Sequence, residues 1–289
     1  MAAQAVTADA QAALGGLLKN YTAEVTARDR KGQDAAPALM APGSEVYIAA
    51  IPGESEDRLV AAAAHLRKAG LVPTPHIVAR NIENRAGLDE LLRRLVGEAG
   101  LDRALVLGGD RDKPAGEFES SLQLLETGLF QKHGVRRIRL ACYPEGHPRI
   151  ADEVLEKARA AKLEVAAKAG LDVWMVSQFC FDPKPIIGLA RRMRAVGVTA
   201  PFRVGVAGPA ERATLVKYAL MCGVGASLRA LKERQDLARS VLTGETPEAL
   251  LSEVAQAQAC DPSLGIAGVH FFTFGALARS AEWADRMMR

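Results

Sequence analysis

One glutamate lies inside an apolar, β-branched segment near the start of the chain, at residues 21–27 (YTAEVTA). Glu24 is flanked by Ala23 and Val25. A carboxylate within an apolar strand is costly unless it is paired or has a chemical role. Burial raises the pKa of a glutamate, which can then donate a proton near neutral pH. Glu24 is therefore a candidate general acid.

A second group of reactive side chains lies in residues 138–150 (IRLACYPEGHPRI). The segment begins as an apolar strand, which two prolines and a glycine then interrupt. The loop that follows presents Tyr143, Glu145 and His147 within five residues. Loops at strand ends often carry binding residues. A simple polar turn is the alternative interpretation of the loop taken alone.

Further polar residues lie in or just after other predicted strands. Asp110 follows two glycines and could equally be a turn or capping residue. His76 and His270 could be core histidines whose hydrogen bonds are satisfied. Gln178 lies in a very apolar segment, VSQFCF, and because a buried amide must find partners, we expect it to face the mouth of the fold.

Eight strand-like segments alternate with helical ones along the chain. The strands are predicted at 21–27, 46–51, 74–79, 104–108, 138–142, 173–181, 202–207 and 268–274. The helices are predicted at 56–69, 85–99, 117–132, 152–169, 185–196, 210–222 and 276–288, several with a glycine behind them. This alternation predicts an α/β fold, a (βα)8 TIM-type barrel. The absence of GxGxxG after the first strand disfavours a Rossmann domain.

Two segments fall outside the repeat. Residues 1–20 are predicted as an N-terminal helical extension, and residues 226–264 are long enough for an additional helix or two before the last strand. No linker-like stretch is visible, so residues 1–289 are expected to form one domain.

Composition narrows the class of protein. The net charge is +3 and aromatic residues make up 5%, which disfavours a nucleic-acid partner. The four cysteines form no CxxC pair, so we predict no metal site. There is no apolar run of about eighteen residues and no signal-peptide pattern. We therefore expect a cytoplasmic protein without a membrane partner.

Five motifs together resemble those of the methylenetetrahydrofolate reductase family, in matching order and spacing over about residues 21–275. They are AxYPEGHP at Ala141–Pro148, SQFCFD at Ser177–Asp182 (close to the family's TQFFFD), Pro75-His76, LGGD at Leu107–Asp110, and HFFT at His270–Thr273.

This resemblance implies a barrel that binds FAD and reduces 5,10-methylenetetrahydrofolate to 5-methyltetrahydrofolate with NAD(P)H. By position, Glu24 resembles the acid that protonates the folate N10, and Asp110 the residue near the flavin and the pterin. Gln178 resembles the amide that binds the pterin, which makes Glu24, Asp110 and Gln178 the implied catalytic residues. The implied cofactor-binding residues are His76, Asp110, Ala141, Tyr143 and His147. The implied substrate-binding residues are Gln178, Tyr218 and Phe272.

The chain departs from the family pattern where FAD would be held. Gly108 stands in the place of an arginine, and the stretch 159–166 keeps Lys162 but has Val165 and Ala166 in place of an Arg-Lys pair. A diphosphate without cationic partners binds less tightly. Three outcomes remain open: FAD held by other residues such as Arg111 and Lys113, weakly held FAD, or direct hydride transfer from NAD(P)H to the folate.

Two other functions remain as alternatives. A barrel methyltransferase acting on methyl-folate with a corrinoid partner would have no need for an acid that opens a ring. A non-catalytic barrel that binds a folate or a partner protein would explain the altered FAD positions, but not the partly buried Glu24. The sequence leaves open the choice of NADH or NADPH, the pterin carrier, the direction of reaction and whether the protein is a homo-oligomer.

Overall fold

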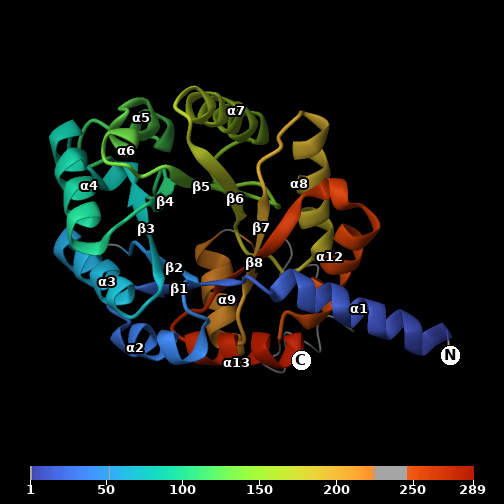
Figure 1. The fold of residues 1–289 in the computed structure, drawn as a ribbon. Coiled ribbons are helices and arrows are strands. Elements are labelled where there is room, and N and C mark those ends of the chain that lie inside the picture. Colours follow the sequence, from blue (N-terminus) through green and yellow to red (C-terminus); the bar gives the residue numbers. More distant parts are fainter. Residues whose placement is uncertain (1, 52, 223, 225–245) are drawn as a thin grey trace. The chain divides into compact units, whose positions relative to one another are not determined.

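The computed structural model describes residues 2–51, 53–222, 224 and 246–289. Eight parallel strands pair in chain order into a closed barrel (Figure 1), which confirms the predicted TIM-type fold. The strands are β1 Thr22–Thr26, β2 Glu45–Ala49, β3 Val72–Val78, β4 Arg103–Leu107, β5 Arg137–Cys142, β6 Asp172–Ser177, β7 Phe202–Ala207 and β8 Ile266–Phe272.

Helices separate the strands along the chain (Figure 1). They are α1 Ala2–Leu18, α2 Arg30–Leu39, α3 Glu56–Lys68, α4 Arg85–Ala99, α5 Ser121–Glu126, α6 Leu129–Lys132, α7 Asp152–Lys168, α8 Pro183–Ala195, α9 Arg212–Met221, α12 Glu248–Cys260 and α13 Leu277–Met288, with short 3-10 helices η1 Ala79–Asn81 and η2 Pro262–Leu264. Among the described residues, no helix combines the length and the apolar character needed to cross a bilayer.

The chain forms two compact units. Unit 1 comprises Met1–Glu24, Cys142–Pro148 and Val176–Arg289, and unit 2 comprises Val25–Ala141 and Arg149–Met175. Within unit 1, α1 packs on α12, α13 and β8, and within unit 2, α3 packs on α4. The expectation of a single domain stays a prediction.

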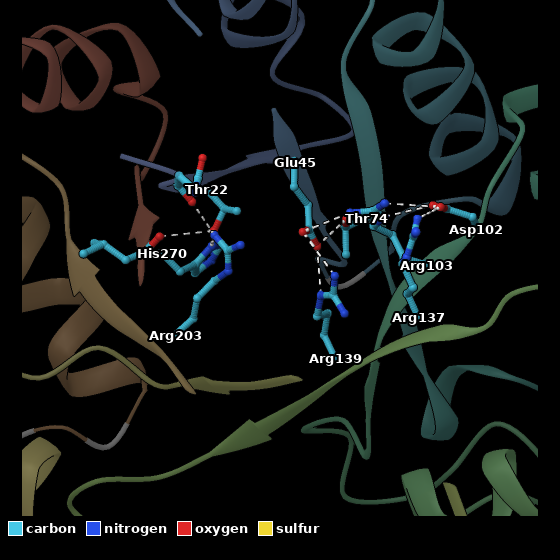
Figure 2. Close-up of polar contacts among 11 residues, drawn as sticks. Thr22, Glu45, Thr74, Asp102, Arg103, Arg137, Arg139, Arg203 and His270 are labelled. Atoms are coloured by element: carbon cyan, nitrogen blue, oxygen red, sulfur yellow. Dashed lines mark hydrogen bonds and ion pairs between the residues drawn. The ribbon is translucent and has the colours of Figure 1, made fainter. Parts of the chain in front are cut away.

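A buried ionic cluster joins four strands of unit 2. Figure 2 shows Glu45 of β2 between Arg139 and Thr74. Arg139 Nε and Nη2 donate to the two Glu45 carboxylate oxygens at 3.0 and 3.3 Å. Thr74 of β3 donates to Glu45 at 3.0 Å, and Arg103 of β4 at 3.3 Å. The single carboxylate therefore ties β2 to β3, β4 and β5.

Two predicted elements are wrong in their extent. The helix predicted at 117–132 is instead α5 and α6, which Gly128 separates with its left-handed backbone (φ +71°). The strand predicted at 173–181 ends at Ser177. The Gln178 side chain accepts the Phe179 backbone N–H, and Asp182 accepts the Lys184 N–H to cap the start of α8, so the intervening residues form a loop. Apolar character at Phe179 and Phe181 reflects burial in a loop and not strand structure.

One helix was not predicted, and one predicted segment is only partly described. Helix α2 carries an internal proline, Pro37, and Asp29 caps its start by accepting the Gly32 N–H at 2.9 Å. The expected N-terminal helix is confirmed as α1. In the segment before β8, α12 and η2 confirm additional helical structure, while residues 225–245 lie outside the described part.

Candidate active site

Glu24 is the central residue of β1, and its side chain is 17% exposed. Its Oε2 atom lies 3.9 Å from Nε2 of His270, whose side chain is 1% exposed. On the other side of the imidazole, Nδ1 lies 2.9 Å from the Thr22 hydroxyl oxygen (Figure 2). Thr22, His270 and Glu24 therefore form a row across the β1–β8 pair.

The strand register explains this row. Thr22 pairs with His270, and Ala23 pairs with Phe271. Because side chains alternate along a strand, Thr22 and Glu24 lie on one face of β1 and both can reach the histidine opposite. The Thr273 hydroxyl donates to the Glu24 carbonyl at 2.5 Å, which fixes the end of β8 against β1.

The contacts of Thr22 indicate the tautomer of His270. The Thr22 hydroxyl can donate to the Val269 carbonyl at 3.4 Å, which leaves its oxygen to accept the His270 Nδ1–H. We assign the proton to Nδ1 on this basis. Nε2 then faces the Glu24 carboxyl group at 3.9 Å, beyond hydrogen-bond distance.

An aromatic cluster adjoins this row in unit 1. The Phe272 ring meets His270 edge-on at 4.9 Å and lies 5.2 Å from Phe179. Tyr218 of α9 stacks on Phe274 with ring centroids 4.4 Å apart and an interplanar angle of 21°. Phe274 in turn meets Phe179 at 5.4 Å. The predicted substrate residues Tyr218 and Phe272 thus share one cluster that extends to His270.

Gln178 lies directly after β6 and is half-buried. Its backbone N–H donates to the Cys142 carbonyl at 2.8 Å. Its side-chain oxygen accepts the Phe179 N–H at 3.0 Å. These bonds hold the Gln178 side chain next to Phe179 of the aromatic cluster. Because the amide oxygen already accepts a hydrogen bond, the amide NH2 group is the part of the side chain suited to a ligand.

The loop after β5 also belongs to unit 1. Tyr143 and His147 meet edge-on at 5.1 Å, and Gly146 closes the turn with a bond from its N–H to the Tyr143 carbonyl.

Burial, and then the nearby Glu145, raises the pKa of the Cys180 thiol far above its ordinary value. Cys180 is therefore unsuited to act as a nucleophile.

The remaining predicted residues, His76, Asp110 and Ala141, belong to unit 2. His76 meets Tyr47 edge-on at 6.4 Å. The side chain of Asp110 is 94% exposed and lies 3.7 Å from Arg149. Gly109 before it has φ +101°, and a Cβ there would lie 2.5 Å from Val78, so the turn requires glycine.

Helix α7 contains the stretch 159–166, where the resemblance implies contacts with FAD. Its only buried residue is Ala166, its Lys168 is paired with Glu164 at 2.6 Å, and Lys162 already has a partner. Arg111 and Lys113, the predicted replacements, are exposed. A dinucleotide diphosphate needs cations directed at it, and Lys157 and Arg159 are the other basic side chains of this helix. Binding of FAD therefore stays a prediction.

Comparison with known families identifies the class of protein. A family model described as methylenetetrahydrofolate reductase matches residues 43–275, most of the chain. The chain belongs to the methylenetetrahydrofolate reductase family. This confirms the resemblance carried by the motifs and supports an oxidoreductase function in folate metabolism. The match begins after β1, so the roles of Thr22 and Glu24 depend on their contacts with β8.

Solved structures share the fold at low identity. A dihydropteroate synthase from Thermus thermophilus is 16% identical with a TM-score of 0.51, and 92% of each chain is covered. A putative phosphonomutase from Burkholderia cenocepacia is 12% identical with a TM-score of 0.50, covering 90% of this chain and 92% of that one. At such identities the likeness shows the barrel fold alone.

Sequence reasoning missed three residues of this site. His270 was noted as a polar residue of the last strand that could be a core histidine, and it was given no role; neither Thr22 nor Phe274 was singled out. The Thr-x-Glu spacing in β1 could have indicated that both side chains share a face. The contact with His270 depends on the pairing of the first and last strands, which no local pattern reveals.

Proposed function

We propose that the protein reduces 5,10-methylenetetrahydrofolate to 5-methyltetrahydrofolate with NAD(P)H, and that Glu24 is the proton donor. The observation that carries this proposal is the row formed by Glu24, His270 and Thr22 in a member of this family. A carboxyl group beside a neutral imidazole, largely screened from water, is suited to deliver a proton near neutral pH.

The chemistry follows from that arrangement. Glu24 protonates N10 of the folate, and the bond between N10 and the methylene carbon breaks to leave an iminium at N5. Hydride from the nicotinamide then adds to the methylene carbon, which becomes the methyl group. His270, held by Thr22 through Nδ1, lies beside the Glu24 carboxyl group and is its proposed positioning residue.

The surrounding residues suit a pterin with its attached ring. The Gln178 NH2 group can donate to an acceptor atom of the pterin, and the half-buried rings of Tyr218 and Phe272 can stack against flat parts of the substrates. Tyr143, His147, His76, Ala141 and Asp110 remain proposed contacts for the cofactor or hydride donor.

For the hydride, we favour direct transfer from NAD(P)H to the folate. The observation in its favour is α7, where Lys168 pairs with Glu164, Lys162 already has a partner, and Val165 and Ala166 stand where a cationic pair was expected. The same observation would suit a non-catalytic barrel, but that alternative leaves the Glu24–His270 contact without a role. A methyltransferase likewise needs no proton donor of this kind.

The first test combines a spectrum with a turnover assay. The purified protein should show no flavin absorbance, and NAD(P)H absorbance should fall only when 5,10-methylenetetrahydrofolate is added, with 5-methyltetrahydrofolate as the product. Added FAD should not change the rate. A rate that depends on FAD would contradict direct transfer. No oxidation of either nucleotide with the folate present would contradict the reductase function.

A further inference from the structure

The turn after β8 holds a phenylalanine in a backbone conformation that phenylalanine rarely adopts. Phe274 has φ +51° and is the one non-glycine residue with positive φ in the described part of the chain. Gly275 follows with φ +83°, and the Ala276 N–H closes the turn on the Thr273 carbonyl at 2.8 Å. Turns with two such central residues favour Asn-Gly, so Phe274 is retained against local preference.

Strain of this kind persists where the surroundings hold it, commonly at binding sites. Here Thr273 anchors the turn to the Glu24 carbonyl, and the Phe274 ring stacks on Tyr218. The turn is thus fixed at Thr273 to the backbone of Glu24, the proposed acid, and its next residue, Phe274, presents a flat ring.

The Tyr218–Phe274 stack lies at the border between core and solvent. Phe179 is fully buried, whereas both stacked rings are half-buried. The ammonium of the exposed Lys217 lies 5.8 Å from the centre of the Tyr218 ring. A flat ring that replaced Phe274 on Tyr218 would keep the stacking contact. The Lys217 ammonium supplies a positive charge near the same tyrosine, which favours a ligand with an anionic group.

We infer that Phe274 is a placeholder that occupies the face of Tyr218 on which a planar, nitrogen-containing ring with an anionic tail stacks, and that it leaves when this ring binds. The inference rests on the proposed function and deepens it, since both a nicotinamide nucleotide and a folate have this chemistry. Phe274 then sets ligand affinity by competing for Tyr218.

The test replaces Phe274 with Asn, which suits the left-handed turn and removes the ring. Calorimetric titration with NADPH and, separately, with 5-methyltetrahydrofolate distinguishes the two sources of the ring. At least one of the two should bind F274N about three- to tenfold more tightly than the wild type, the range expected when a competing stack is removed. Phe274→Gly should behave in the same way.

Two controls separate competition from general loosening. Phe181→Leu removes a ring of the same cluster that meets Phe179 at 5.9 Å, and it should leave both affinities unchanged. In the Tyr218→Leu background, Phe274→Asn should give no gain, because the contested face is absent.

A spectroscopic measurement follows the exchange directly. In protein labelled with fluorotyrosine, the Tyr218 resonance, assigned with Tyr218→Phe, should move on ligand addition and should already be displaced in F274N. Equal or weaker binding by F274N, a Tyr218 resonance that saturating ligand leaves unmoved, or binding of neither probe would overturn the inference. Binding with a moved resonance but no folate reduction would support it and contradict the proposed function instead.

Discussion

At the scale of single residues, the proposed chemistry depends on how His270 is held. Its Nδ1 lies 2.9 Å from the Thr22 hydroxyl and its Nε2 lies 3.9 Å from Glu24, so the contact with Thr22 goes with the orientation that turns Nε2 toward the acid. Thr22 is not proposed to touch the substrate. It is a positioning residue that acts through the imidazole.

Replacing Thr22 with Val tests this role. Loss of a buried hydrogen bond is worth about 0.5–1.5 kcal/mol, so kcat should fall several-fold to about tenfold and its pH profile should shift. Thr22→Ser, which keeps the hydroxyl, should restore both. A Val variant with an unchanged pH profile would show that Thr22 serves structure alone.

At the scale of elements, the buried Glu45 cluster holds the start of β2 to three other strands. Glu45 and Arg139 are 6% and 4% exposed. Removing one partner of a buried ion pair costs about 3–5 kcal/mol when the remaining charge loses its compensation. Without Arg139, Arg103 at 3.3 Å would still compensate part of the Glu45 charge, so the expected loss lies at the low end of this range. The pair is thus expected to matter far more for folding than the ion pairs on the surface.

Arg139→Met should therefore lower the free energy of unfolding in urea by about 3 kcal/mol. The matched control is Glu164→Gln, which breaks the exposed pair with Lys168 and should change that free energy by less than about 0.5 kcal/mol. Similar losses in the two variants would contradict the structural role assigned to Glu45.

Asp102 gives the same region a pH dependence. Burial raises the pKa of this carboxyl, but hydrogen bonds and charges from Arg103 and Arg137 outweigh burial and leave the pKa below its ordinary value. Its stabilising contribution is present above the unfolded-state pKa of about 3.9 and is lost as pH falls through the lower folded-state value. The difference in unfolding free energy between wild type and Asp102→Asn should accordingly shrink below about pH 4. A difference that stays constant down to strongly acidic pH would contradict this assignment.

At the scale of the whole molecule, periodic patterns predicted the barrel because each strand and helix carries its own apolar spacing. Helix α4 begins and ends where its pattern predicts, between the Asn84 cap and Gly100. Helix α2 was missed because its sequence is mostly polar and contains Pro37, a residue that usually marks the end of a helix. Its N-cap, Asp29, was therefore not recognised. Strand β6 was predicted too long because buried loop residues such as Phe179 resemble strand residues.

The candidate site was predicted in its residue types more than in its contacts. Glu24 was recognised from the cost of a carboxylate in an apolar strand, which is a local property. The contacts among Thr22, Glu24 and His270 join residues almost 250 positions apart in sequence. Such contacts follow from barrel closure and not from any local pattern, so only the structure could supply them.

The most direct test of the central claim is the turnover of Glu24→Gln, an isosteric change that removes the acidic proton. With saturating NAD(P)H and 5,10-methylenetetrahydrofolate, we expect the rate to fall by about 10²–10⁴-fold, the usual contribution of a general acid. Thermal stability should stay near that of the wild type, and the exposed control Glu126→Gln should keep full activity. Wild-type turnover by the folded Glu24→Gln variant would contradict the assignment of Glu24 as the proton donor.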